Sequence, residues 1–172
     1  MKRWLYLTPL AVLGALALLF AGYALHHDPH VNPAALVGRP VPEVSLRPLG
    51  GGTPQAVAAA PRPVLVNFFA SWCAPCVEEA PALMALKSEG VLIIGVAYKD
   101  RPEKSQAFLR DHGDPFLDTF QDPDGRAGVE YGISGVPETF AVSADGVVLA
   151  KHVGPLTPDA AEALVERASR RR

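Results

Sequence analysis

The chain contains only two cysteines, Cys73 and Cys76, and their close spacing constrains the fold more than any other feature. One helical turn brings residues three positions apart to the same side, and a disulfide needs Cβ atoms within about 3.5 to 4.5 Å. Residues 64–69 are a short apolar, β-branched and aromatic run typical of a buried strand, and residues 77–87 are rich in helix formers. The order of strand, cysteine pair and helix therefore places Cys73 near a helix N-terminus.

This position predicts different roles for the two thiols. Free N–H groups and the helix dipole stabilise a thiolate at a helix N-terminus and can lower a cysteine pKa to about 3.5 to 7.5. We therefore expect Cys73 to be the nucleophile of a thiol–disulfide exchange, and Cys76, one turn inside the helix, to be the resolving thiol.

The cysteine pair has two competing interpretations. A structural zinc site needs four ligands at paired spacings, and the chain has neither a second Cys-x-x-Cys pair nor a His-x3–5-His motif. Two inert buried cysteines would leave Trp72 and Pro75 without a packing role. Redox chemistry is favoured because strand and helix fall where a thioredoxin-type pair requires them, so we expect neither a metal nor another cofactor.

The N-terminal part has the composition of a membrane segment. Residues 4–25 carry no charge over 22 positions, which is about 33 Å of helix at roughly 1.5 Å per residue, enough for a hydrocarbon core of about 30 Å. Lys2 and Arg3 precede it, and the positive-inside rule then places the rest of the chain outside the cytoplasm. We expect residues 1–27 to be a membrane anchor, with a cleaved signal peptide as the alternative.

The remainder divides into a short linker and one domain. Residues 28–40 are rich in proline and polar side chains, as a tether would be, and residues 41–172 have the length of one ordinary domain. The formal net charge of the whole chain is only -2, which gives no reason to expect a nucleic-acid partner.

Beyond the cysteines the pattern predicts an α/β fold with a mixed sheet covered by helices. Strands are expected at residues 91–97, 138–142 and 147–152, a turn at 143–146, and helices at 102–112 and from about residue 157 onward. Residues 114–132 are expected to hold one strand and one short helix.

Two motifs carry a family resemblance. Residues 72–76, Trp-Cys-Ala-Pro-Cys, and residues 135–140, Gly-Val-Pro-Glu-Thr-Phe, resemble the thioredoxin superfamily, in which Val136 and Pro137 would form a cis peptide facing the dithiol. Residues 38–42, Asn67 and residues 98–100 (Tyr-Lys-Asp) are similar to its membrane-tethered CcmG/DsbE branch. The resemblance covers residues 36–167 and implies a thioredoxin-like fold, with a central mixed β-sheet flanked by helices, for residues 41–172.

The resemblance also implies a function and partners. Members of this branch are thiol:disulfide reductases of cytochrome c maturation, which keep the haem-site cysteines of apocytochrome c reduced. The expected partners are apocytochrome c or a haem-ligation component as substrate, and a transmembrane electron donor of the DsbD/CcdA type. The expected location is the bacterial inner membrane, with a single membrane pass and the catalytic domain on the periplasmic side.

The same resemblance nominates site residues beside the cysteines. Pro137 is expected to face the dithiol, and Trp72 and Val136 are expected to contact the substrate. In plain thioredoxins a buried aspartate occupies the position of Asn67, which cannot titrate. Glu79 and Glu138 correspond to acidic positions of the branch, and either is a candidate to handle the proton of Cys76. Ser134 departs from the branch, which often carries an aromatic residue there.

The direction of electron flow is argued from charge. No histidine lies between the cysteines to stabilise the Cys73 thiolate, and nearby carboxylates destabilise it, which favours the disulfide form and hence a reductant. A strong oxidant of the DsbA kind is the competing hypothesis. The same residues are also compatible with a TlpA-like or ResA-like reductase for copper-site or other exported proteins, and with a module that binds apocytochrome without turnover.

Overall fold

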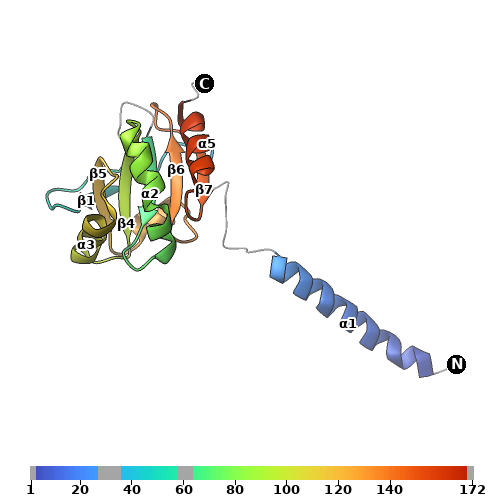
Figure 1. The fold of residues 1–172 in the computed structure, drawn as a ribbon. Coiled ribbons are helices and arrows are strands. Elements are labelled where there is room, and N and C mark those ends of the chain that lie inside the picture. The colour runs from blue at the N-terminus through green and yellow to red at the C-terminus, as the bar shows by residue number, and fades with distance from the viewer. Residues whose placement is uncertain (1–2, 27–35, 58–63, 170–172) are drawn as a thin grey trace. The chain divides into compact units, whose positions relative to one another are not determined.

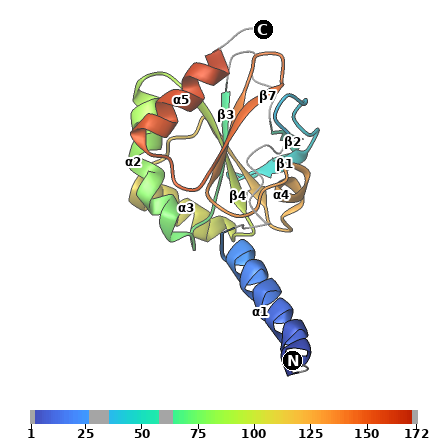
Figure 2. The same ribbon diagram turned by 90° about the vertical axis from the view of Figure 1, so that its right-hand side faces the viewer.

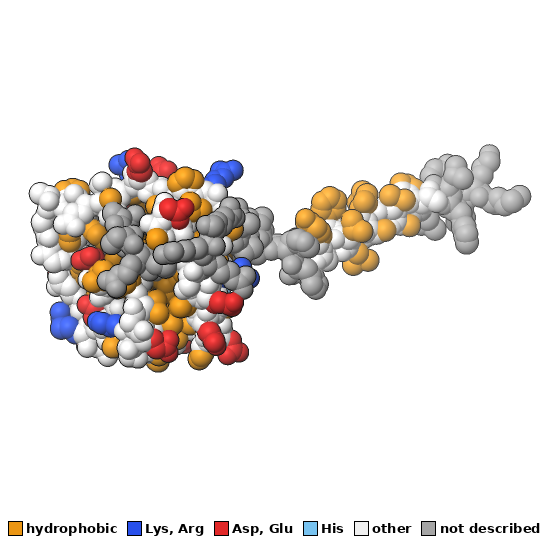
Figure 3. Space-filling model, turned by 90° about the horizontal axis from the view of Figure 1, so that it is seen from above, with side chains coloured by type: hydrophobic (Ala, Val, Ile, Leu, Met, Phe, Trp, Pro, Cys, Tyr) orange, Lys and Arg blue, Asp and Glu red, His pale blue; other side chains and the backbone are white. Residues whose placement is uncertain are grey.

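The computed structural model describes residues 3–26, 36–57 and 64–169, with side chains of the first helix described for residues 8–23. Residues 1–31 and 32–172 form two separate units. The first unit contains one helix, α1 (Arg3–His26), whose described side chains are mostly hydrophobic (Figure 3). Within the described part of the chain, however, no helix is both long and apolar enough to cross a membrane.

The second unit alternates strands and helices as the sequence predicts. Its elements are β1 (Ser45–Pro48), β2 (Gln55–Ala56), β3 (Val64–Phe69), α2 (Ala74–Ser88), β4 (Leu92–Tyr98), α3 (Pro102–His112), β5 (Asp118–Asp122), α4 (Arg126–Glu130), β6 (Glu138–Val142), β7 (Val148–Val153) and α5 (Pro158–Ser169). The expected strand and short helix within residues 114–132 are β5 and α4.

The strands form one mixed sheet in the order β2-β1-β5-β4-β3-β6-β7 (Figure 1). β3, which leads into the cysteine pair, lies between the parallel neighbour β4 and the antiparallel neighbour β6. All six residues of β3 are buried. Because it is central, both faces of β3 pack against other parts of the domain, which explains its uninterrupted apolar character.

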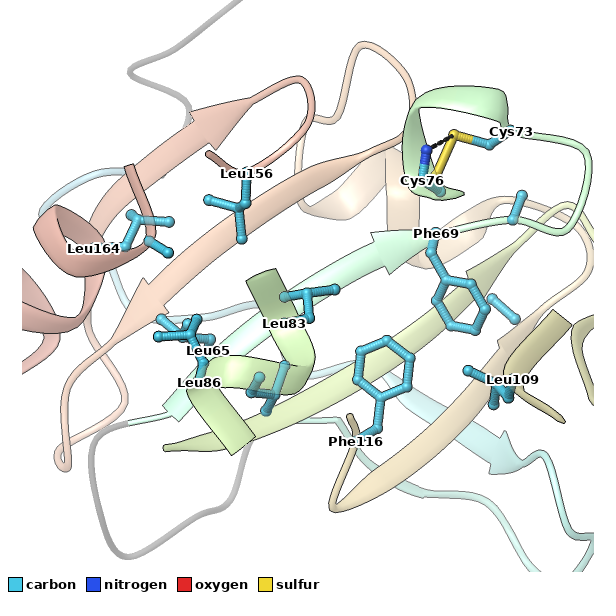
Figure 4. Close-up of a cluster of buried hydrophobic side chains, with 14 of the residues drawn as sticks. Leu65, Phe69, Cys73, Cys76, Leu83, Leu86, Leu109, Phe116, Leu156 and Leu164 are labelled. Atoms are coloured by element: carbon cyan, nitrogen blue, oxygen red, sulfur yellow. Dashed lines mark hydrogen bonds between the residues drawn. A yellow bond between two sulfur atoms is a disulfide. The ribbon is translucent and has the colours of Figure 1, made fainter. Parts of the chain in front are cut away.

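Side chains of β3 alternate between two hydrophobic cores, one on each face of the sheet. Leu65 and Phe69 join the core beneath α2, α3 and α5 (Figures 2 and 4). Val66 and Phe68 point to the opposite face, into a core that includes Ala127 of α4 and the rings of Tyr131 and Phe140. Truncating a core phenylalanine such as Phe69 to alanine would cost about 3 to 5 kcal/mol. The end of β3 is therefore firmly held where the chain turns into the cysteine pair.

The segment before β1 also contacts the domain. The Gly38 N–H donates to the carbonyl of Val148 (2.8 Å), and the Val148 N–H donates to the carbonyl of Arg39 (2.9 Å). These residues fall within the expected linker, residues 28–40, of which 28–35 lie outside the described residues.

Candidate active site

Cys73 and Cys76 form a disulfide at the start of α2. Cys73 is the N-cap residue, with extended backbone, and its Sγ accepts a hydrogen bond from the Cys76 N–H at 3.2 Å (Figure 4). Pro75 stands in the first turn, where its missing N–H costs no helical bond. Cys73 therefore occupies the helix N-terminus and Cys76 lies one turn inside it, as the sequence predicts.

The loop before β6 faces the disulfide. The Val136–Pro137 peptide bond is cis, as expected. The Sγ of Cys73 lies 3.5 Å from the carbonyl oxygen of Val136, which brings together residues 63 positions apart. Val136 lies beyond Glu138, where the pairing of β6 with β3 ends, so the backbone of Val136 is not committed to that ladder.

Trp72 is the exposed apolar side chain beside the disulfide. It is 60% exposed, and its indole N–H donates to the carbonyl of Lys99 at 3.3 Å. An indole held by its N–H presents a large apolar surface whose orientation is set by the protein.

Asp100 fastens the turn that precedes the cysteines. Its carboxylate accepts hydrogen bonds from the N–H and hydroxyl of Ser71 (2.8 and 2.9 Å), from the Ser105 hydroxyl (2.8 Å) and from the Arg101 N–H (2.8 Å). Burial by itself would raise the pKa of Asp100, but these hydrogen bonds outweigh it and lower the pKa. An ionised Asp100 thus ties the loop after β4 to the loop that carries the dithiol.

Glu79 lies on the buried face of α2, three residues after Cys76. It is fully buried, and its two carboxylate oxygens accept hydrogen bonds from the Asn67 side-chain amide (2.9 Å) and the Leu156 N–H (3.0 Å). Burial raises the pKa of Glu79 to about 7, although both hydrogen bonds act to lower it. This carboxyl group can therefore gain or lose a proton near neutral pH.

Asn67 joins Glu79 to the central sheet. Its amide also donates to the Thr139 hydroxyl of β6 at 3.0 Å. Asn67, Cys76 and Glu79 all line one small cavity of about 10 Å³, close to the space that one water molecule needs. Asn67, which cannot titrate, stands where plain thioredoxins have an aspartate. Glu79 of α2 thus supplies a titrating carboxyl group to the same space.

Glu138 has different surroundings. It is fully buried, and it pairs with the Lys151 ammonium group at 2.7 Å. Its other oxygen accepts hydrogen bonds from the N–H (2.8 Å) and the hydroxyl of Ser134. Because neighbouring residues of a strand point to opposite faces, and Thr139 faces Asn67, Glu138 points to the far side of the sheet from Glu79.

The structure therefore brings together most of the nominated residues but separates one of them. Cys73, Cys76, Trp72, the Val136–Pro137 pair and Glu79 gather around the N-terminus of α2, while the Glu138 carboxylate faces away. Two contacts of the site are not predicted from the sequence. Ser134 donates hydrogen bonds to Glu138, and Asp100 accepts hydrogen bonds from the loop that carries the dithiol. Among the residues with described positions, no group of three or more His, Cys, Asp or Glu side chains could hold a metal ion.

Comparison with known proteins agrees with this geometry. The Redoxin family model matches residues 36–167. The chain is 42% identical to the thiol:disulfide interchange protein HelX of Rhodobacter capsulatus, over 92% of both chains. It is 36% identical to the thiol:disulfide interchange protein DsbE of Escherichia coli, over 92% of this chain and 89% of that one.

A solved structure shows the same fold. The thioredoxin-family thiol:disulfide interchange protein of Chlorobium tepidum has a TM-score of 0.63 and 26% identity, over 83% of this chain and 99% of that one. The domain thus has a thioredoxin-like α/β fold with a mixed sheet.

Proposed function

Because the chain belongs to the redoxin family and is a thiol:disulfide interchange protein of the DsbE and HelX type, we propose that it reduces the haem-site cysteines of apocytochrome c during cytochrome c maturation. Its oxidoreductase activity resides in the Cys73–Cys76 pair. The observation that carries the proposal is a dithiol at a helix N-terminus with a carboxyl group of near-neutral pKa beside the second sulfur. The choice of apocytochrome c, or a haem-ligation component, rests on the resemblance to the CcmG/DsbE branch.

The first step is attack by the Cys73 thiolate on the substrate disulfide. A bond forms between Cys73 and one substrate sulfur, the substrate S–S bond breaks, and the second substrate sulfur leaves as a thiolate that takes up a proton. The N–H groups at the start of α2 stabilise the attacking thiolate. The Cys76 N–H, which donates to the Cys73 Sγ in the disulfide form, is one of these donors.

The second step releases the substrate. Cys76 transfers its proton to Glu79, through the cavity that both residues line, and then attacks the Cys73 sulfur. The Cys73–Cys76 disulfide forms, the mixed disulfide breaks, and the remaining substrate sulfur leaves as a thiolate. Two electrons have then passed from the protein to its substrate. A dithiol donor, of the DsbD/CcdA type by resemblance, returns two electrons and restores the reduced form.

Trp72 and Val136 are the proposed substrate contacts. The exposed indole of Trp72 offers apolar area next to Cys73. The backbone of Val136, which precedes the cis Pro137 and lies outside the β3–β6 ladder, can pair with an extended substrate segment as an added strand. A substrate strand bound there would carry its disulfide to Cys73, whose Sγ is 3.5 Å from the Val136 carbonyl.

We further propose that residues 1–27 deliver the domain, residues 41–172, to the outer side of the bacterial inner membrane. The uncharged segment that follows Lys2 and Arg3 supports export. N-terminal sequencing of the protein from membrane and periplasmic fractions distinguishes a retained anchor from a cleaved signal peptide. Recovery of the chain in the cytoplasm would contradict the proposal.

The roles of the two thiols are tested with single substitutions in the full chain. We expect Cys76→Ser to trap a mixed disulfide with an oxidised Cys-x-x-Cys-His apocytochrome, whereas Cys73→Ser should trap none and both variants should lose turnover. In the reduced wild-type protein, alkylation should select Cys73. Preferential labelling of Cys76 would contradict the assignment. Absence of turnover in the wild-type protein, together with apocytochrome binding that survives Cys76→Ser, would indicate a binding module instead. A faster reaction with an oxidised copper-site protein than with the apocytochrome would indicate a TlpA-like reductase.

A further inference from the structure

The helices α2 and α5 cover the same face of the sheet (Figures 1 and 2). A groove of about 640 Å³ is lined by residues of both helices. Its floor is apolar and is lined by three alanines, Ala82, Ala85 and Ala161, together with Leu86, Leu156 and Val165. The volume lies within the range of about 300 to 1,000 Å³ that is usual for binding sites. The alanines keep the two helices from filling the space between them.

The rim of the groove carries one sign of charge. Glu78 and Glu89 of the α2 side, and Asp159 and Glu162 of α5, line it and are all exposed. Neither lysine nor arginine is among the residues that line it. Carboxylates of one sign around a low-dielectric apolar floor attract a cation more strongly than scattered surface charges do. The groove therefore complements a segment with one apolar face and several basic side chains.

The groove reaches the first turns of α2, the end of the helix that carries the dithiol. Glu78 is the second residue after Cys76, and Leu156, whose N–H binds Glu79, lies in the floor. A protein disulfide must come within bonding distance of Cys73 to react, so the chain that carries it passes over this end of α2. The rest of that chain can then follow the groove along α2 and α5.

We propose that this groove binds a basic amphipathic segment of the protein whose disulfide Cys73 attacks. The inference rests on the proposed thiol–disulfide exchange and adds to it a recognition site at a distance from the reacting sulfurs. Contacts made there lower the half-saturating concentration of the substrate without changing the chemical step.

The test compares three synthetic substrates of the reduced full-length protein in single-turnover kinetics. One is a short peptide with an internal disulfide, the second adds an amphipathic lysine–leucine extension, and the third replaces its lysines by glutamine. The basic extension should lower the half-saturating concentration by about tenfold or more relative to both other peptides. Equal values for all three would overturn the proposal. Failure to reduce even the short peptide would instead contradict the exchange activity itself.

Two matched triple variants locate the effect. Glu89→Lys, Asp159→Lys and Glu162→Lys together should abolish the advantage of the basic extension and leave the short peptide within about twofold. Glu103→Lys, Asp111→Lys and Glu130→Lys change the net charge equally at exposed sites outside the groove, and Glu103, like Asp159, lies in the first turn of its helix. This control should keep the advantage. If both triple variants lose the advantage of the basic extension equally, long-range charge attraction explains it, and the groove is not the binding site.

A third variant tests the apolar floor without changing charge. Ala85→Trp, at an exposed position of α2, should fill the groove and remove the advantage of the basic extension. If this variant keeps the full advantage of the basic extension, the groove is not the binding site. Concentration-dependent dimerisation of the wild-type protein that the groove variants abolish would also overturn the proposal, in favour of a second copy as the occupant.

Discussion

Glu79 and Glu138 are both fully buried, yet they lie on opposite faces of the sheet and have opposite surroundings. Glu79 receives only neutral donors, the Asn67 amide and the Leu156 N–H, and shares a cavity with Cys76. Glu138 receives a cation, Lys151, together with two donors from Ser134. Burial alone therefore does not define a proton carrier.

The surroundings of Glu79 show what allows a buried carboxyl group to titrate near neutral pH. Loss of hydration favours the neutral form, and neutral hydrogen-bond donors offset only part of that cost, so the pKa of Glu79 rises to about 7. A cation next to a buried carboxylate compensates its charge and supports ion-pair structure instead. On this comparison we propose Glu79 as the group that exchanges a proton with Cys76, and Glu138 as a residue that stabilises the loop before β6.

The largest effect is expected from breaking the ion pair on the Glu138 side. Lys151→Met should leave a buried carboxylate without its cation and lower the free energy of unfolding by about 3 to 5 kcal/mol. Adding Glu138→Gln should recover most of the loss, because the buried charge is then absent. Urea unfolding at neutral pH measures both, with the exposed Lys104→Met as control. If Lys151→Met lowers the free energy of unfolding no more than the control does, the ion pair does not distinguish Glu138 from Glu79.

A slightly smaller effect is expected from pH on the Glu79 side. The pKa of Glu79 is higher in the folded protein, about 7, than its ordinary value of 4.5, so folding is favoured by the protonated form. Its contribution is full below about pH 4.5 and is lost as the pH rises through about 7, an amount of about 3 kcal/mol. The difference in unfolding free energy between wild type and Glu79→Gln should follow this curve. A difference independent of pH would contradict it.

Much of the fold is visible in local sequence. The strand at residues 64–69 and the helix at 102–112 have the expected bounds, because an apolar run and a proline at a helix start act within a few residues. The sequence does not predict β1 and β2, since Ser45–Pro48 and Gln55–Ala56 are short and include polar or proline residues. They are strands because β1 pairs with both β2 and β5, and these neighbours supply the hydrogen bonds.

The site was predictable in its residues but not in its pairings. The Cys-x-x-Cys spacing and the Val136–Pro137 pair were sufficient to nominate the reacting centre, and Glu79 and Glu138 were indistinguishable at that level. Lys151 reaches Glu138 only through the β6–β7 register, in which it lies opposite Phe140. Likewise Asp100 meets Ser71 because β3 and β4 are parallel neighbours whose ends lie together. Such contacts depend on strand order, which a single sequence does not display.

The third prediction concerns the rate at which the mixed disulfide is resolved. If Glu79 accepts the proton of Cys76, Glu79→Gln should slow resolution by about 10²-fold at neutral pH, as loss of a general base does. Glu138→Gln, on the other face, should change the rate by less than about threefold. Rapid-quench measurement of substrate release from the preformed mixed disulfide checks both. Equal slowing by the two variants would erase the functional difference between the carboxylates.

The most direct test is the titration of the Glu79 carboxyl group itself. The ¹³C chemical shift of its carboxyl carbon in the disulfide form, assigned by comparison with Glu79→Gln, reports protonation at that one site. The account predicts a midpoint near pH 7. A midpoint near the ordinary value of 4.5 would mean that Glu79 is ionised throughout the neutral range, and it would contradict the assignment of Glu79 as the group that receives the Cys76 proton.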